Sequence, residues 1–263
     1  MRRAVALGLP LKRDLVFWGA VAALAGLTLH QFGLFDASRI SQGLSNLAVF
    51  SRDTVPPDVG ILPLAGRALW ETVQMAFAGT FLGFLIALPL GFLGARSLAP
   101  LPVVWLSRLI VAVARTIPSL LWAVLFVIVV GLGPLAGTLG LTFYTVGYLG
   151  KLYAELFEGT DPEVVEAFRG VGASRLQLAR FVVWPESANA AISQLLFMLE
   201  YNIRASSILG FAGAGGIGFY MSIYLQTLEY QRLTTLLLLI LALILVMDLV
   251  SAWVRNRYLL DSR

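Results

Sequence analysis

Apolar blocks of nearly membrane-spanning length recur along this chain and leave few folds open to it. A helix needs about 20 apolar residues to cross a bilayer, because unsatisfied backbone amides are very costly in hydrocarbon. About six blocks fit this length: Leu15 to Phe35, Ala68 to Gly94, Leu120 to Gly131 with an apolar extension from Val103, Leu135 to Leu156, Ala188 to Leu209, and Leu233 to Val254. Arg108, Arg115 and Pro118 interrupt the first half of the third block. The pattern predicts an all-α, polytopic membrane protein with about six transmembrane helices.

The composition agrees with a membrane location and removes most catalytic hypotheses. The chain has 263 residues, of which 59% are hydrophobic and only 13% charged, so lipid must cover its excess apolar surface. It has no cysteine and a single histidine, His30, which excludes disulfides and thiolate nucleophiles and argues against metal clusters and His-based triads. We therefore expect no catalytic residue, no bound metal and no enzymatic activity in this chain.

The positive charges indicate topology and not nucleic-acid binding. The net charge is +4, but Lys and Arg lie mainly between the apolar blocks and form no single patch. Because positive residues resist translocation, the loops that hold most of them should be cytoplasmic. These cations are Arg2, Arg3, Lys12 and Arg13; Arg96 and Arg108; Lys151, Arg169, Arg175 and Arg180; and Arg255, Arg257 and Arg263. An even number of spans with both termini in the cytoplasm satisfies this bias.

The long connection Phe157 to Glu186, which this topology places in the cytoplasm, begins with a helix-start signal. Asp161 can cap free backbone amides, Pro162 suits the first helical position, and Glu163 complements the positive end of the helix. Gly172 then offers a stop. The signals predict a short amphipathic helix between these points.

A second short helix should follow directly. Ser174 and Gln177 have the spacing of a capping box, and Pro185 should end the helix. On composition alone, the two helices could also be elements that lie on the membrane surface.

The spacing within this connection resembles the EAA loop of binding-protein-dependent ABC importers. That pattern is EAA, three residues, Gly, nine residues, Ile, one residue and Leu-Pro, which this chain matches with Glu166-Ala167-Phe168, Gly172, Val182 and Trp184-Pro185. Phe168, Val182 and Trp184 depart from the family's residue types. The resemblance implies a coupling helix that docks into a groove on a separate ATPase subunit. The residues implied in this coupling are Glu163, Glu166, Ala167, Phe168, Gly172 and Pro185.

A later stretch is similar to phosphonate-type and methionine-type permeases of that family. It runs from Asn202 to Gly210 and continues with Gly213 to Gly218. Arg115 to Pro118, Gly131 to Pro134 and Leu149 to Leu152 resemble the phosphonate-type branch more closely. The implied function is the passage of phosphonate, or a related phosphorus oxyanion such as phosphate or phosphite. A methionine-type or other small-solute importer is the alternative.

The resemblance also implies a domain organisation and a set of partners. Residues 67–257 would form a type I ABC importer permease domain, residues 1–66 an N-terminal transmembrane helix with an extracytoplasmic loop, and residues 258–263 a cytoplasmic tail. The implied partners are ATP-binding ABC subunits, an extracytoplasmic solute-binding protein, and a second permease copy or paralogue, all at the cell membrane. ATP and Mg would be bound by the partner ATPase, so this chain would need no cofactor.

A secondary transporter driven by an ion gradient is the more distant alternative. Such carriers use intramembrane acids as ion or proton relays and often contain inverted repeats. Few acids lie within the apolar blocks, and no repeat is apparent. This class is therefore disfavoured.

The glycine-rich stretch matches GxGxxG at Gly213, Gly215 and Gly218, but no strand signal precedes it, so a dinucleotide-binding loop is not expected. A tight re-entrant turn in which backbones pack closely fits the context better. We expect this turn, which includes Gly216, to act at the external gate.

Glu200 and Arg204 lie inside the fifth block, where each charge costs roughly 2.5 to 3.5 kcal/mol unless it is paired or faces water. Their spacing, with the acid four residues before the base, favours an ion pair between them. Alternatively, Arg204 faces the translocation path and attracts an anionic phosphonate or phosphate. Asp248 should pair with Arg255 or another internal cation, and Arg115 should anchor a helix end or form part of the gate.

Overall fold

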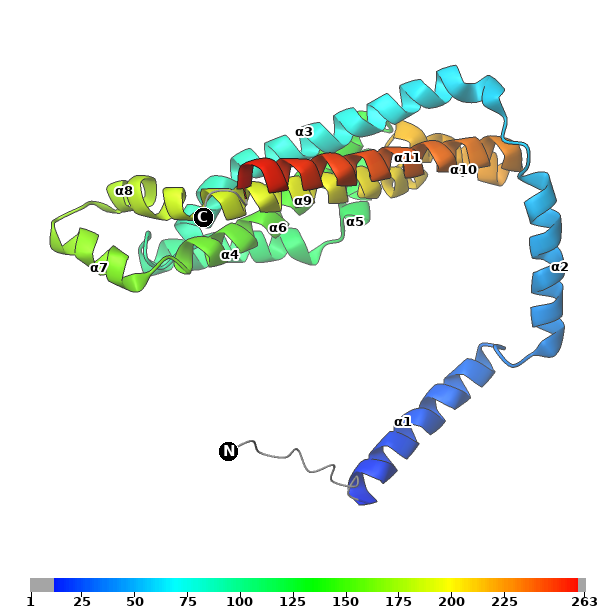
Figure 1. Cartoon of the computed structure of the whole chain (residues 1–263), viewed down its shortest axis with the longest axis horizontal. Helices are drawn as coiled ribbons and strands as arrows, with labels where there is room; N and C mark the ends of the chain where they lie inside the picture. The colour runs from blue at the N-terminus through cyan, green and yellow to red at the C-terminus, as the bar shows by residue number, and fades with distance from the viewer. Residues whose placement is uncertain (1–11, 260–263) are drawn as a thin grey trace. The chain divides into compact units, whose positions relative to one another are not determined.

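The computed structural model describes residues 12–259, which form helices joined by short connections (Figure 1). The longer helices are α1 (Lys12–Gln31), α2 (Ala37–Asp53), α3 (Leu62–Gly94), α4 (Leu101–Thr116), α5 (Ser119–Val130), α6 (Pro134–Glu158), α9 (Trp184–Leu209), α10 (Gly216–Gln226) and α11 (Tyr230–Val254). Shorter helical segments are η1 (Val59–Ile61), α7 (Pro162–Gly170), α8 (Arg175–Leu178), η2 (Ala179–Val183), η3 (Gly210–Ala212) and η4 (Arg255–Leu259). These residues include no strand, so the predicted all-α class is confirmed. The cations at positions 2, 3 and 263 and most of the predicted tail lie outside the described residues.

The chain divides into two units between Val55 and Pro56. The first unit contains α1 and α2, and α2 begins at Asp36, whose carboxylate accepts a hydrogen bond from Ser38 N at 3.0 Å. The second unit contains all the remaining elements. This division lies before the boundary that the sequence predicts between residues 66 and 67. Asp58 already belongs to the second unit, because its backbone amide donates to Gln231 O in α11 at 3.3 Å.

All six predicted apolar blocks are helical, but not all form straight spans. Two segments of the described chain, Val59–Gly94 and Tyr230–Arg257, are each long and apolar enough to cross a membrane alone. Two bent pairs raise this number to four: α4 with α5, bent by 88°, and Arg175–Ala212 with α10, bent by 46°. The first bend follows Ile117, which is extended because the ring of a following proline disfavours helical backbone.

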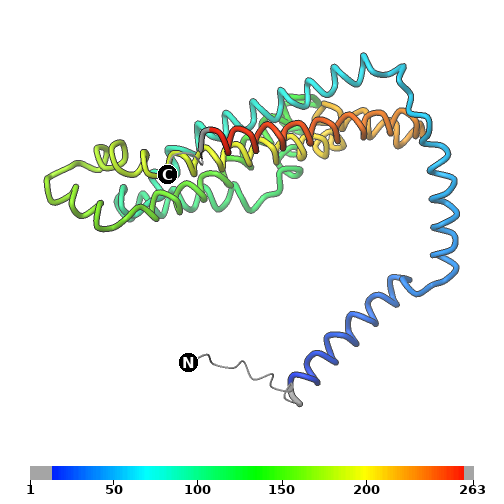
Figure 2. Tube along the Cα trace, viewed as in Figure 1, coloured from blue at the N-terminus to red at the C-terminus, as the bar shows by residue number. Residues whose placement is uncertain are grey.

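Glycines allow the long helices of the second unit to pack backbone against backbone. Helices α3, α6, α9 and α11 run alongside one another in this unit (Figure 2). A Cβ atom on Gly147 of α6 would overlap the backbone of Arg115 in α4, and one on Gly140 would lie 2.8 Å from Ala123 N in α5. Close approach through small residues is the usual way in which membrane helices associate, since lipid gives no hydrophobic drive between them.

A buried polar residue connects the three central helices. Asn202 of α9 is fully buried, and its Nδ2 donates to Thr80 Oγ1 of α3 at 2.8 Å and to Thr145 Oγ1 of α6 at 2.9 Å. Hydrogen bonds of this kind between membrane helices add about 1 kcal/mol each. These two hydrogen bonds of Asn202 fix the register of α9 against α3 and α6.

Asp58 joins the start of α3 to the start of α11. Its carboxylate accepts hydrogen bonds from Gly60 N at 2.8 Å and from Arg232 Nε at 3.1 Å, and its carbonyl accepts one from Thr235 Oγ1 at 2.9 Å. The Gly60 amide, and next the Arg232 guanidinium, hold the pKa of Asp58 below its ordinary value.

This lowered pKa predicts a pH-dependent joint. A carboxyl whose pKa is lower in the folded state stabilises the fold above its unfolded pKa of about 3.9, and the contribution is lost as pH falls through the folded value. We expect Asp58→Asn to melt at a lower temperature than the wild type at pH 7, and the two melting temperatures to converge below about pH 4. Tryptophan fluorescence during thermal unfolding in detergent measures both; a gap that stays constant from neutral to acid pH would contradict this assignment.

Candidate coupling surface and transport path

Helix α7 begins as its capping signals predict. The Asp161 carboxylate accepts a hydrogen bond from Glu163 N at 2.9 Å, and Pro162 occupies the first turn. Val165 is the buried residue of this helix. The predicted coupling residues of α7 all lie on its exposed side: Glu163, Glu166, Ala167 and Phe168.

The turn between the two short helices also follows the prediction. Gly172 has a φ of +85°, the left-handed conformation that favours glycine. The capping box is present in both directions: Gln177 N donates to Ser174 Oγ at 3.3 Å, and Ser174 N donates to Gln177 Oε1 at 2.8 Å. Residues 161–185 are called the α7–α8 hairpin below.

The prediction that Pro185 ends the second helix is wrong. The chain remains helical from α8 through η2 into α9, and Pro185 lies in the first turn of α9. The π-type hydrogen bond from Trp184 N to Ala179 O accommodates the junction. A proline is tolerated here because the hydrogen-bond pattern changes from π-type to α-type at this junction, where the missing donor of Pro185 is accommodated. The hairpin therefore continues without a break into the long helix α9.

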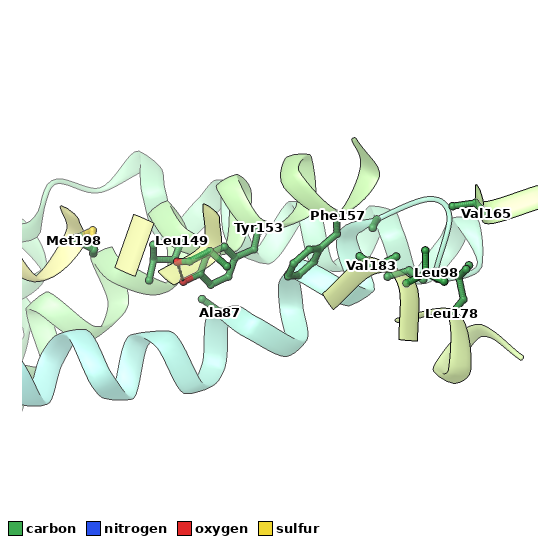
Figure 3. Close-up of a cluster of buried hydrophobic side chains, with 12 residues drawn as sticks. Ala87, Leu98, Leu149, Tyr153, Phe157, Val165, Leu178, Val183 and Met198 are labelled. Carbon is green, nitrogen blue, oxygen red and sulfur yellow. Dashed lines mark hydrogen bonds between the residues drawn. The ribbon is translucent and has the colours of Figure 1, made fainter. Parts of the chain in front are cut away.

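The inner face of the α7–α8 hairpin packs onto the helix bundle. Figure 3 shows Val165, Leu178 and Val183 gathered with Leu98 and Phe157 at one end of the core. Leu178 and Val183 are almost completely buried, and Phe157 of α6 is fully buried. Close packing of this kind resists deformation and transmits strain between the packed elements.

The outer face of the hairpin is apolar and exposed. Val171 is 84% exposed, Leu176 79% and Phe181 60%, and Arg180 lies 5.5 Å above the ring of Phe181. Large exposed apolar side chains of this kind are candidates for a surface that a partner covers. The hairpin thus has two faces, one fixed to the bundle and one available to a partner.

The glycine-rich stretch forms the tight turn that the sequence predicts. Gly213, Gly215 and Gly216 have φ values of +86°, +81° and +67°, which residues with a Cβ rarely adopt. A Cβ on Gly218 would overlap Ser207 O, and one on Gly210 would overlap the backbone of Gly218. We call residues 210–218 the glycine turn; its role at a gate stays a prediction.

Two other elements hold the glycine turn in place. Gly216 N donates to Glu71 Oε1 at 2.7 Å, and Ile217 N donates to Thr72 Oγ1 at 2.8 Å, both on α3. Gly133 N, in the connection between α5 and α6, donates to Gly213 O at 2.9 Å. The turn is therefore a junction at which α3, α5, α6 and α10 meet.

The ion pair expected between Glu200 and Arg204 is not formed. Each residue instead pairs with the C-terminal part of the chain: Glu200 Oε1 lies 3.5 Å from Arg255 Nη1, and Arg204 Nη1 lies 3.4 Å from Asp248 Oδ1. Helix α11, which runs beside α9, offers Asp248, and η4, which follows it, offers Arg255. Local spacing reveals neither partner. Asp248 thus pairs with an internal cation other than Arg255.

Arg204 also lines a cavity of about 540 Å³ between α4, α5, α6 and α9. Arg115, Ser119, Tyr144 and Tyr201 contribute to the same wall. The Tyr144 and Tyr201 rings stack with their centroids 5.2 Å apart. The cavity thus brings two arginines and two tyrosines together in a lining that is otherwise mainly apolar.

Sequence reasoning missed Glu71 and the two tyrosines. Glu71 is a carboxylate within the second apolar block, and an intramembrane acid of this kind is by default a candidate functional residue, so that signal was present. Tyr144 and Tyr201 carry no such signal, because tyrosines are common in membrane helices and only packing brings these two together.

These features define a polytopic helical membrane protein whose α7–α8 hairpin packs on one end of the bundle and leaves its other side exposed. The chain belongs to the family of binding-protein-dependent transport system inner membrane components, whose pattern matches residues 79–259. It is therefore a multi-pass inner-membrane protein and a component of a transport system.

Two relatives and one solved structure give this assignment detail. The chain is 35% identical over 244 residues to the phosphite transport system permease protein PtxC of Stutzerimonas stutzeri, covering 91% of this chain and 89% of that protein. It is 31% identical over 253 residues to the phosphate-import permease protein PhnE of Mycolicibacterium smegmatis, covering 94% of this chain and 47% of that protein. The MetNI methionine ABC transporter superposes with a TM-score of 0.67 at 24% identity, over 76% of this chain and 98% of the matched chain. This likeness shows the type I importer fold.

Proposed function

We propose that this chain is the permease subunit of an ATP-driven importer and forms the translocation path for a phosphorus oxyanion such as phosphite, phosphate or phosphonate. The two-faced α7–α8 hairpin carries the proposal, since it joins an exposed apolar surface to the ends of the long helices. The relatives whose names state phosphite transport and phosphate import support the substrate class.

The mechanism needs no catalytic group in this chain. Partner ATPase subunits bind ATP and Mg, and their closure pushes the α7–α8 hairpin as a rigid lever. Helix α9 continues from the hairpin, so the motion reaches the bundle and reorients the path. A solute-binding protein on the outer side releases its ligand into the opened path. Direction follows from the coupling free energy between the ATP-bound and cavity states.

In this arrangement the hairpin and both termini are cytoplasmic, and a second permease copy or paralogue completes the path. Because the chain has no cysteine, single cysteines report its sidedness cleanly. In sealed vesicles that hold the permease without its ATPase, a Leu176→Cys variant should react with an impermeant maleimide only from the cytoplasmic side. Labelling from the opposite side would overturn the orientation.

Vesicle uptake tests the function itself. Purified permease, ATPase and receptor are reconstituted, and uptake of phosphite, phosphate, methylphosphonate and methionine is measured with and without ATP. The proposal requires uptake of a phosphorus oxyanion that depends on both ATP and receptor. Uptake driven by an ion gradient alone would support a secondary carrier, and uptake of methionine alone would move the chain to the methionine-type branch.

Glu166→Arg should weaken ATPase retention by about tenfold or more, as expected when a charge at the centre of an interface is reversed. Glu166 lies on the exposed side of α7, and it has no ion-pair partner among residues 12–259. Its loss therefore leaves no unpaired cation among the residues that the structure describes. Co-purification of the ATPase from detergent, followed by ATP-dependent uptake, measures the effect.

Asp53→Arg is the matched control, because it makes the same charge reversal on exposed helix α2, outside the hairpin. It should retain the ATPase at the wild-type level. Full retention and transport by Glu166→Arg would show that the hairpin is not the docking surface.

A further inference from the structure

The cavity at the break between α4 and α5 brings two positive charges together within the predicted membrane-spanning part of the chain. Arg115 enters it from the last turn of α4, and Arg204 enters it from α9. Among the described residues that line it, none is a carboxylate. Such charges are costly inside a membrane unless they are paired or face a water-filled path.

The two arginines differ in their pairing. Arg204 has Asp248 at 3.4 Å, whereas Arg115 has no ion-pair or hydrogen-bond partner for its side chain within residues 12–259. The Arg115 guanidinium thus retains its donors for something that enters the cavity. The charge in the recess exceeds what Asp248 neutralises.

The start of α5 adds to this field. The 88° break turns α5 away from α4, and Pro118, Ser119 and Leu120 of its first turn line the same cavity. The first amides of a helix have no intrahelical acceptor, and no side chain caps this end of α5. Free amides and the positive end of a 12-residue helix favour an anion beside them.

We infer that this cavity is an anion-binding station within the permease itself, built for a small anion with several unsubstituted oxygens. The inference deepens the proposed function and rests on it. Arg115 and Arg204 would each donate a charge-assisted hydrogen bond to an oxygen of the anion. The hydroxyls of Tyr144 and Tyr201 could donate to an ionised oxygen or accept from a protonated one. A phosphite or phosphate ion has this form, whereas an amino acid has a single carboxylate and a cation that the arginines would repel.

The size of the cavity indicates a passing station and not a tight site. The volume of the cavity is about 540 Å³. A phosphate ion occupies only the volume of a few water molecules, each of which takes about 30 Å³. The ion would keep part of its water shell. It would compete with the Asp248 carboxylate for the guanidinium of Arg204. Transport requires this balance, because a path must bind its cargo strongly enough to admit it and weakly enough to release it.

The test measures anion binding without the receptor. Radiolabelled inorganic phosphate is bound to the permease–ATPase complex in nanodiscs, and unlabelled phosphite or methionine is added as competitor. We expect binding that phosphite displaces and methionine does not. Arg115→Gln should weaken it at least about tenfold, the loss of one charge-assisted pair, and Arg115→Lys should lose less. Uptake at saturating loaded receptor should fall in the same order.

Arg67→Gln is the matched control, since it removes one exposed positive charge from α3 and does not line this cavity. It should keep wild-type binding and uptake. If Arg115→Gln does not yield folded complex, the double variant Arg204→Gln with Asp248→Asn removes the other cation without stranding its partner, and should weaken binding equally.

The outcomes separate the station from the proposed function. If the wild type takes up phosphorus oxyanions with ATP and receptor but Arg115→Gln binds and transports as well as it does, only the station is overturned. Absence of phosphate binding by the wild-type complex, or equal displacement by methionine, also overturns it. If the wild type transports no phosphorus oxyanion at all, the proposed function fails first.

Discussion

Gly218→Ala should cost about 3 kcal/mol of folding free energy, at the upper end of the range for overpacked sites. The added Cβ would overlap Ser207 O and would lie 3.1 Å from the Cα atom of Gly210. These are backbone atoms, so no side-chain rotation relieves the overlap, and α9 must separate from α10. The variant should therefore lose the contacts that hold the glycine turn against α3.

The melting temperature of the permease–ATPase complex in detergent measures this loss, and ATP-dependent uptake reports its effect on the path. Gly66→Ala is the matched control: it is a helical glycine of α3 with no atom within 4 Å of an added Cβ. That change should stabilise the chain by about 0.5 to 1 kcal/mol, because alanine is the better helix former. Equal melting temperatures for the two variants would contradict the packing described for the turn.

Leu178→Asn should detach the α7–α8 hairpin from the bundle and abolish coupling. Leu178 is only 1% exposed, and its replacement removes buried methyl groups and buries an amide. The first effect costs about 2 to 5 kcal/mol and the second about 1 to 3 kcal/mol. We expect uptake to fall at least about tenfold, and the hairpin of the permease to become a site of limited proteolysis, since local opening would now need little free energy.

Leu176→Asn tests the outer face of the hairpin independently of the inner face. Leu176 is 79% exposed, so its replacement should leave proteolysis of the permease unchanged and weaken co-purification of the ATPase. Proteolysis therefore reports the inner face, and co-purification reports the outer one. If both variants change the same measurement to the same extent, the hairpin does not act as a two-faced lever.

Much of the fold follows from short-range signals. Apolar length predicts a helix at each of the six blocks, and the capping residues Asp161 and Ser174 predict where α7 and α8 begin. Arg115 and Pro118 also mark the block that the structure breaks. Pro185 misled the prediction, because a proline that ends one helix and a proline that opens the next look alike in sequence.

The candidate site is predicted less completely, because its parts come from distant positions. The α7–α8 hairpin lies within one connection, so its spacing could be read directly. Glu200 and Arg204 were matched to each other because they are neighbours on one helix, yet their partners lie 55 and 44 residues away. Glu71 reaches the glycine turn across 145 residues.

Apolar block length, turn glycines and helix caps predict, without any structure, a helical membrane protein with a short two-helix connection between its fourth and fifth apolar blocks. Those signals act within a few residues of chain and depend on backbone hydrogen bonding and transfer into lipid. Only tertiary packing determines which residues pair with Glu200 and Arg204, and only packing brings Glu71 to Gly216. It also places Arg115, Arg204 and the start of α5 around one cavity. These contacts depend on which helices lie side by side. The residue pattern within one helix does not specify which helix packs against it.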